Sequence, residues 1–233
     1  MHAMSAHTSP PARPFPAHGP KTCDASGMIE IHRMLLHAFT DALPLVESVA
    51  ERDVRHARWV GVQLDLISGT LHAHHEGEDA RLWTMLETRA PACALHVERM
   101  KQQHAEMVVH LRALDAAVPP WELTATRAAA VPVRKALAGI IAALAAHFPD
   151  EEDTIVPVVE HVVKRSEAAW FAKHGRAATP KGQTWNVIGA ILVAQPDGGR
   201  AWKKKNLPWP ARVAWRLKGE RRYRQFRAAI EGR

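Results

Sequence analysis

Cysteine is scarce in this sequence, and signals of export or membrane insertion are missing. Cys23 and Cys93 are the only cysteines, too few for a disulfide framework or a thiolate metal site. No uninterrupted apolar run of about 18 residues suggests a transmembrane helix. The start of the chain lacks the charged residues and apolar stretch of a signal peptide, so we expect a cytoplasmic location.

The sequence also lacks the motifs of several common enzyme classes. The 13 glycines are scattered, and we find neither a glycine-rich phosphate loop nor a nucleophile elbow. Histidine, by contrast, is abundant: there are 15, many of them near acidic residues. Nitrogen and oxygen donors of this kind suit zinc, iron, nickel or copper better than calcium or magnesium.

Charge is unevenly distributed along the chain. The formal net charge is +7. Residues 166–233 hold 15 basic and 4 acidic residues, a net of +11, whereas residues 1–165 hold 16 basic and 20 acidic residues, a net of −4. The basic character therefore belongs to the C-terminal segment alone.

Apolar spacing predicts long helices after a proline-rich start. The composition of residues 1–25 predicts a disordered arm. Beyond it, apolar residues recur at helical intervals, and the third helix is expected to stop at Pro119. The predicted helices begin near Met28 and then cover residues 53–89, 92–118 and 124–165. We therefore predict an all-α fold, an antiparallel up-down four-helix bundle over residues 26–165, with a helical C-terminal extension over residues 166–233.

Histidines and acids four residues apart are more frequent than chance allows. Composition predicts about 1.5 such pairs, yet the chain has five. On a helix, this spacing places both side chains on one face, where they can bind one metal pair. The pairs are His37/Asp41, His72/Glu76, His74/Glu78, His75/Asp79 and His147/Glu151.

An internal repeat singles out two of these pairs. Residues 74–86 align without gaps on residues 147–159, and the histidine, two acids and three apolar positions coincide. Two copies related by a pseudo-twofold axis would face each other across a bundle core. His32 and His104, each flanked by apolar residues, would complete the site from the remaining helices.

This pattern resembles the hemerythrin family and its His-His-Glu cation-binding relatives, over residues 28–161. The resemblance implies a non-haem di-iron site between the helices, with two bridging carboxylates. The implied iron ligands are His32, His74, Glu78, His104, His147 and Glu151, of which Glu78 and Glu151 would bridge. The ferritin-like alternative uses Glu-x-x-His, and no paired set of that motif is present.

One position departs from the pattern of oxygen-carrying relatives. They have a second histidine four residues before the third-helix ligand, where this chain has Met100. One iron would then lack a nitrogen donor or take another from His75, His72, Glu76 or His37. Reversible oxygen carriage is therefore not the function that we expect.

Simpler interpretations stand beside the metal site. His74/Glu78 and His147/Glu151 could be surface helix contacts, and lone histidines are often hydrogen-bonded core residues. Asp79 and Glu152 could orient ligand imidazoles or be solvated charges. We interpret a further group mainly as surface or supporting residues: His37, His75, His96, His110 and His161.

The basic C-terminal segment has three interpretations. We favour a helix that packs its aromatic residues on the bundle and exposes its charges. Tryptophans among cations would also suit an anionic membrane surface, and contact with nucleic acid is the least favoured. Tryptophan at an apolar–polar boundary with flanking cations favours the membrane surface over nucleic acid.

We expect a di-iron protein that binds or reduces dioxygen, hydrogen peroxide or nitric oxide, with peroxide or nitric oxide consumption as its enzymatic form. An iron or oxygen sensing module without turnover is the alternative. A structural bundle with incidental histidines is the third hypothesis.

Overall fold

The computed structural model describes residues 19–233, and every regular element in that range is helical. Residues 1–18, most of the predicted arm, lie outside the described part. The bundle elements are α1 (Ser26–Ser48), α2 (Val54–Gly77), η1 (Glu78–Leu82), α3 (Trp83–Arg89), η2 (Pro91–Cys93), α4 (Ala94–Thr124), α5 (Arg127–Thr154) and α6 (Val156–Val162). The C-terminal elements are α7 (Arg165–Ala177), α8 (Thr184–Ala194), α9 (Arg200–Asn206), α10 (Trp209–Ala214), η3 (Trp215–Gly219) and α11 (Glu220–Ile230).

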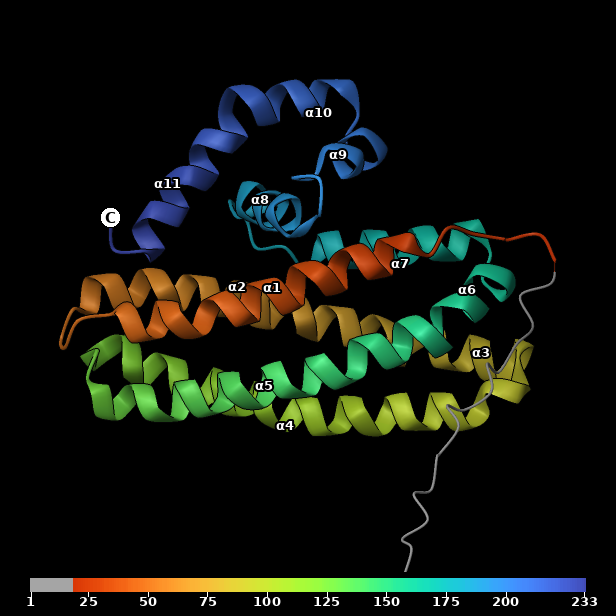
Figure 1. The fold of residues 1–233 in the computed structure, drawn as a ribbon, viewed down its shortest axis with the longest axis horizontal. Helices are drawn as coiled ribbons and strands as arrows, with labels where there is room; N and C mark the ends of the chain where they lie inside the picture. Colours follow the sequence, from red (N-terminus) through yellow and green to blue (C-terminus); the bar gives the residue numbers. More distant parts are fainter. Residues whose placement is uncertain (1–18) are drawn as a thin grey trace, which may run out of the picture.

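Four long helices form the bundle. α1 packs on α2 and α5, and α4 packs on the same two helices, so each long helix has two neighbours. Successive helices run in opposite directions, and α1 and α2 form one layer over α4 and α5 (Figure 1). The predicted fold class, an antiparallel all-α bundle with a helical C-terminal extension, is confirmed.

The third bundle helix is longer than predicted. α4 continues through Pro119 and Pro120 to Thr124. The prolines remove bonds to the carbonyls of Asp115 and Ala116, but both residues are exposed, so water can bind those carbonyls. Burial of Trp121 in the core favours the extra turn. The prediction that this helix stops at Pro119 was therefore wrong.

The bundle core is divided into two apolar clusters by a polar layer. The larger cluster contains Leu71, Met107 and Leu144, and the smaller one contains Leu82 and Met100. Along each helix the layer falls between members of the two clusters. Buried histidines and glutamates fill it, and the packing of apolar side chains on both sides fixes their positions.

The end of the predicted arm packs on the bundle. Thr22 donates its backbone N–H to the carbonyl of Glu160 and its hydroxyl to the carbonyl of Val163, each at 2.7 Å. Cys23 and Ala25 are buried. The predicted disordered arm of residues 1–25 thus extends too far, because its last residues contact α6.

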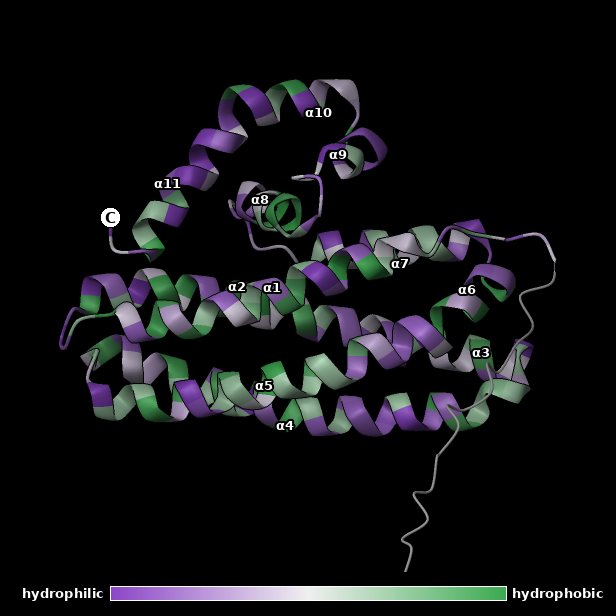
Figure 2. Cartoon of the chain, in the orientation of Figure 1, coloured by the Kyte–Doolittle hydropathy of each residue, from purple (hydrophilic) through white to green (hydrophobic). Residues whose placement is uncertain are grey.

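The C-terminal extension covers one side of the bundle. α8 packs on α1, and α11 packs on α2 and α8 (Figure 1). Hydrophobic residues are concentrated in α8, whereas α9 to α11 are mainly hydrophilic (Figure 2). The Nε2 atom of His56 donates to the carbonyl of Ile230 at 2.8 Å, which fixes the end of α11 to α2.

By length and composition, α5 is the one helix of the described chain that could cross a membrane. It is also a central helix of the bundle, and its buried residues include His147 and Glu151. Its apolar side chains such as Leu137 and Leu144 belong to the larger core cluster. Packing inside the bundle therefore accounts for its hydrophobicity.

Candidate metal centre

The polar layer brings all six sequence-predicted donors together. They come from every wall of the bundle, and all but His74 are at most 2% exposed. α1 supplies His32, α2 supplies His74, η1 supplies Glu78, α4 supplies His104, and α5 supplies His147 and Glu151. A seventh residue, His75 of α2, lies in the same layer and is 3% exposed.

The donor atoms fall into two groups, each of which could hold a cation. One group contains His32, His74, Glu78 and Glu151. The other contains His75, His104 and His147. Within either group the donor atoms all lie within 4.8 Å of one another, so the layer offers two adjacent metal positions.

Distances between ring nitrogens fit shared ligation. The Nε2 atoms of His32 and His74 are 3.0 Å apart, and those of His104 and His147 are 3.2 Å apart. Neighbouring ligands on an ion with bonds of about 2.1 Å are separated by roughly 3.0–3.5 Å. Small side-chain adjustments would therefore suffice for binding.

The two glutamates lie between the metal positions. Glu78 places Oε1 3.4 Å from Nε2 of His74 and Oε2 3.6 Å from Nε2 of His104. Glu151 places Oε2 3.3 Å from Nε2 of His32 and 3.6 Å from Nε2 of His147. Each carboxylate therefore faces histidines of both groups, as a bridging ligand would.

Polar atoms without partners provide the test of fit. Both ring nitrogens of His75 and all four carboxylate oxygens of Glu78 and Glu151 are buried without a hydrogen-bond partner among the described residues. A buried unsatisfied group costs about 1–3 kcal/mol, a large fraction of the roughly 5–15 kcal/mol by which a protein is stable. Cations bound between these atoms would satisfy them, so the residues fit a metal pair.

Neighbouring polar side chains orient three of the imidazoles. The Nδ1 atom of His104 donates to Asp79 at 2.9 Å, and that of His32 donates to Glu152 at 2.9 Å. The Nδ1 atom of His147 donates to Oε1 of Gln103 at 2.8 Å. Such contacts fix the tautomer and direct each Nε2 lone pair toward the metal position.

Burial keeps most of the histidines neutral. It lowers the pKa of His74 and of His75 well below the usual range, and lowers the pKa of His147 to about 4. Burial opposes the charge on His32 as well, but the nearby carboxylate of Glu151 and the hydrogen bond to Glu152 outweigh that effect and raise its pKa. Neutral imidazoles have a free lone pair, which metal binding requires.

The two buried carboxyl groups differ in charge. Burial and the charge of Glu151 raise the pKa of Glu78 well above its usual range. Burial would also raise the pKa of Glu151, but the close approach of the His32 ring, whose Nε2 lies 3.3 Å from Oε2, lowers it to about 2. Without metal, the pair therefore holds about one negative charge, because two would repel at this separation.

His75 was interpreted from the sequence as a surface or supporting residue, but it lies in the centre. Its ring stacks on that of His104, with centroids 4.0 Å apart. Consecutive residues on a helix are 100° apart, so His74 and His75 can reach different metal positions. Met100, which stands where oxygen-carrying relatives have a histidine, is buried in the smaller cluster and offers no nitrogen. His75 thus supplies a ring nitrogen to the metal position that lacks this donor.

The other histidines considered from the sequence lie outside the centre. His37 is exposed, as is Glu76, and His72 bonds to Asp115 at 3.0 Å. His96 bonds to Arg99. None of these, nor His110 or His161, belongs to a donor group among the described residues.

A π-helix begins at Glu78. Five residues, Glu78–Leu82, adopt this wider turn between α2 and α3, and single π-turns inside helices are frequently found at functional sites. The added width lets Glu78 face the metal positions while Leu82 and Trp83 still pack in the smaller cluster. Nothing in the composition of the segment predicted this turn.

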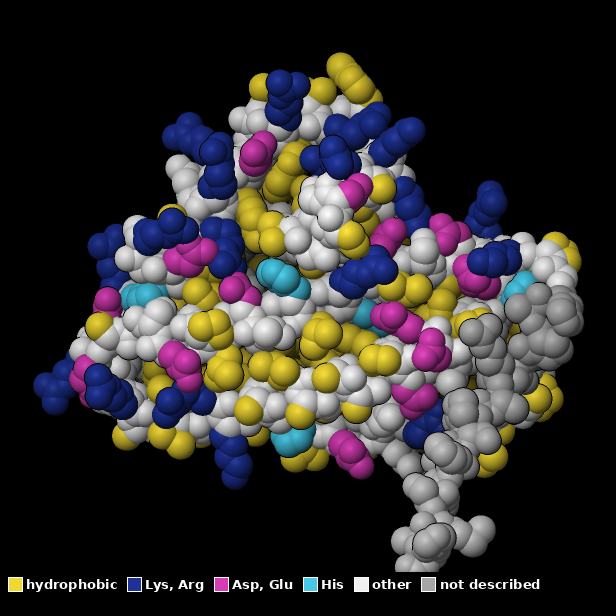
Figure 3. All heavy atoms as spheres, in the orientation of Figure 1, with side chains coloured by type: hydrophobic (Ala, Val, Ile, Leu, Met, Phe, Trp, Pro, Cys, Tyr) yellow, Lys and Arg dark blue, Asp and Glu magenta, His cyan; other side chains and the backbone are white. Residues whose placement is uncertain are grey.

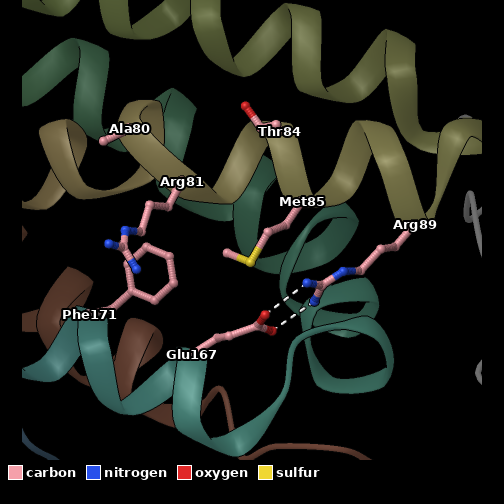
Figure 4. Close-up of a pocket in the computed structure, with 7 residues that line it drawn as sticks. All are labelled: Ala80, Arg81, Thr84, Met85, Arg89, Glu167 and Phe171. Atoms are coloured by element: carbon pink, nitrogen blue, oxygen red, sulfur yellow. Dashed lines mark hydrogen bonds and ion pairs between the residues drawn. The ribbon is translucent and has the colours of Figure 1, made fainter.

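A surface pocket of about 310 Å³ lies beside the centre but contains none of its donors. It is lined from η1, α3 and α7, where Arg89 forms two hydrogen bonds to Glu167, each of 2.7 Å (Figure 4). Arg81 also stacks on Trp170 at 4.0 Å. We interpret the pocket as the seam where α7 covers the π-helix.

Comparison with known families agrees with this geometry. The model of the hemerythrin HHE cation binding domain matches residues 25–159, more than half of the chain. The protein therefore belongs to the hemerythrin HHE family, and its His and carboxylate clusters fit the cation binding that this domain suggests. Searches of curated proteins and of solved structures returned no match.

Proposed function

We propose that this protein holds two non-haem irons and binds or reduces a small ligand: dioxygen, hydrogen peroxide or nitric oxide. The observation that carries the proposal is the set of six unpartnered buried atoms on His75, Glu78 and Glu151. Mixed imidazole and carboxylate donors suit iron. Bound iron would supply the redox chemistry and open coordination positions.

The two positions would differ in reactivity. One has three imidazoles, from His75, His104 and His147, and the other has two, from His32 and His74. The position with fewer protein ligands leaves more room for a small ligand. His74, whose side chain is 11% exposed, is the most accessible donor and marks the direction of entry.

Apolar side chains would shield the ligand from bulk water. Phe148 stacks on the ring of His32, with centroids 4.0 Å apart and planes 5° from parallel. Leu144 and Met107 close the layer on the larger-cluster side, and Met100 closes it on the other. Exclusion of water strengthens the interaction between the centre and a charged or polar ligand.

The first test is elemental analysis and the ultraviolet-visible spectrum of aerobically purified protein. We expect about two irons per chain and near-ultraviolet charge-transfer bands, as buried carboxylates can bridge two ferric ions. The double variant His74→Ala/His147→Ala should lose both. His72→Ala, on the same helix but bonded to Asp115, is the matched control and should lose neither.

The same measurements can also contradict the proposal. If wild-type protein stays free of iron after anaerobic reconstitution with ferrous iron, the di-iron proposal is wrong. If iron is bound, consumption of peroxide or nitric oxide, or a reversible spectral change with dioxygen, identifies the ligand.

Sensing without turnover is the second candidate, and one contact favours it. Gln195, just after α8, donates from Nε2 to the carbonyl of Glu30 at 3.1 Å and accepts from Arg33. These residues flank His32 on α1, so a shift of His32 would reach the C-terminal extension directly. The test is limited proteolysis of iron-loaded protein in its oxidised and reduced states. If the protein shows no turnover and the protease sensitivity of the extension changes with redox state, this candidate is favoured over the first.

A further inference from the structure

The C-terminal helices form an arch over α8. We define the arch as α10, η3 and α11, residues 209–230. Its α10 end lies far from the bundle, and its C-terminal end returns to α2 (Figure 1). The inner side packs closely: Trp215, Phe226 and Ile230 are at most 7% exposed, and a Cβ on Gly219 would lie 2.6 Å from the rings of Trp185 and Trp215.

The opposite side of the arch exposes large apolar side chains. Trp209 is 69% exposed, Leu217 is 76% exposed and Val213 is 36% exposed. They recur at four-residue intervals, so they lie on one face of the helix. Residues two apart on a helix are about 200° apart, so Leu217 points away from the bundle when Trp215 points toward α8. We call this side the outer face.

Basic residues surround these apolar side chains. Between Trp209 and Arg224 there are six basic residues and one acidic residue, Glu220, a net of +5. All six are exposed, and none has an ion-pair partner in the described part of the chain. They are Arg212, Arg216, Lys218, Arg221, Arg222 and Arg224, of which Arg222 lines a pocket with Trp59 and Trp185 on the inner side of the arch. Lys and Arg side chains also gather over the extension in the space-filling view, with hydrophobic atoms between them (Figure 3).

Cations nearer the bundle are differently placed. Arg227 pairs with Asp41 and Glu231, and Lys205 pairs with Asp24 and Glu30. The pairs with Asp41, Asp24 and Glu30 attach the extension to the bundle. The unpaired cations of the outer face are therefore not needed for the packing of the extension.

We propose that the outer face of the arch docks on an anionic lipid bilayer. Tryptophan and leucine side chains enter the boundary between headgroups and acyl chains, while arginine and lysine contact lipid phosphates. A nucleic acid would pair with the cations but would leave Val213 and Leu217 without an apolar partner. Leu95 and Leu123 are also exposed, but the cations that follow them in the sequence form ion pairs: Arg99, Lys101 and Arg127.

The sequence favoured a C-terminal extension that packs its aromatic residues on the bundle, and this holds for some of those residues. Trp215 and Phe226 are buried, and Trp202 packs against the larger core cluster. Trp209 does not follow it, because it is largely exposed. The docking proposal concerns this outer face and does not depend on the identity of the metal.

Sedimentation of the full chain with lipid vesicles tests the proposal. We expect binding to vesicles that contain phosphatidylglycerol, little binding to phosphatidylcholine alone, and release at high salt. Trp209→Ser/Leu217→Ser should bind about tenfold more weakly. Replacing Arg216, Arg221 and Arg224, which are exposed, by Gln should weaken binding at least as much.

Matched controls lie on the bundle. Leu123 is 71% exposed, and the side chain of Arg127 is 93% exposed. Leu123→Ser and Arg127→Gln should leave vesicle binding within about twofold of wild type. Circular dichroism and metal content of every variant verify that the fold is intact.

Three outcomes would overturn the proposal. The first is equal binding to neutral and anionic vesicles. The second is anionic-vesicle binding that the Trp209→Ser/Leu217→Ser change leaves intact. The third is tighter binding to duplex DNA than to vesicles, with the apolar variant unaffected, which would assign the face to nucleic acid instead.

Discussion

The two His-x-x-x-Glu segments of the bundle occupy matching places but are not equal. Each contributes a histidine and a glutamate, and each follows the glutamate with an acid that binds an imidazole: Asp79 binds His104 and Glu152 binds His32. The first segment, however, has His75 where the second has Phe148. One copy therefore adds a donor, while the other adds an apolar cover for His32.

This difference teaches how a symmetric bundle can hold an asymmetric centre. The two His-x-x-x-Glu pairs and the acids that follow them obey the pseudo-twofold relation, and the difference between His75 and Phe148 breaks it. The break also follows the helix geometry: the first copy continues as a π-helix, whereas the second is interrupted at Ile155 and resumes as α6, which has Pro157 in its first turn.

The largest expected effect comes from removal of the distinguishing donor. His75→Phe makes the copies alike, and the three-imidazole position should lose metal by more than the roughly 10–100-fold that loss of a supporting contact costs. Iron content should fall to about one per chain. The double variant His75→Phe/Phe148→His should regain metal, with the third imidazole now beside His32. Elemental analysis of the three proteins checks this, and full retention of iron by His75→Phe would contradict the assignment of His75.

The supporting acids should have smaller and comparable effects. Asp79→Asn and Glu152→Gln each remove a carboxylate that orients an imidazole, and metal affinity should fall about 10–100-fold in each case. Glu152 is the less exposed, at 29% against 50% for Asp79, so its variant should be the more affected. Competition with a chelator measures the affinity, and Asp153→Asn, at an exposed neighbour, is the control. A large loss of metal affinity in only one of the two variants would show that Asp79 and Glu152 do not support the site equally.

A contact found only in the first copy should matter less. The Nε1–H of Trp83 donates to Asp79 at 2.6 Å, and the matching residue in the second copy is Val156. Trp83→Phe retains most of the buried ring and should lower the free energy of unfolding by about 1 kcal/mol. Its effect on metal affinity should be smaller than that of Asp79→Asn. Urea unfolding and chelator competition test both points, and a loss as large as that of Asp79→Asn would assign the orientation of Asp79 to Trp83.

The smallest expected effect concerns the packing of α7 on the first His-x-x-x-Glu segment. Hydrogen bonds from Arg89 and from the backbone of Lys164 lower the pKa of Glu167 to about 2, below its usual 4.5. A folded-state pKa below the unfolded value gives stability that is present above about pH 4.5 and is lost as the pH falls toward 2. Metal-free wild-type protein should therefore lose slightly more stability than Arg89→Ala between pH 5 and pH 3. Urea unfolding at both pH values measures the free energy of unfolding. An equal loss of stability in the two proteins would contradict the prediction.

The bundle and the placement of six donors could be predicted from the sequence because each rests on a repeated signal. Helical periodicity locates the four long helices, and the repeat locates His74, Glu78, His147 and Glu151 together. His75 had a signal too, since adjacent histidines on one helix can serve adjacent metal positions. The sequence analysis named His75 as one possible replacement donor, but the repeat does not single it out, because the matching residue is Phe148.

Other features had no local signal. The passage of α4 through Pro119 depends on burial of Trp121, which is a tertiary contact. The π-helix depends on the need for Glu78 to face one side while Leu82 and Trp83 keep their places in the smaller cluster. The exposure of Trp209 depends on how the arch crosses α8, which composition alone does not determine.

The division of the core has a consequence for how the protein matures. The larger apolar cluster contains none of the six donors and provides packing that needs no cofactor. The long helices can thus pack on one another without a bound cation, unlike small domains that fold only around their metal. A cation would then enter a bundle whose helices are already assembled, so the order of maturation would be folding first and cation binding second.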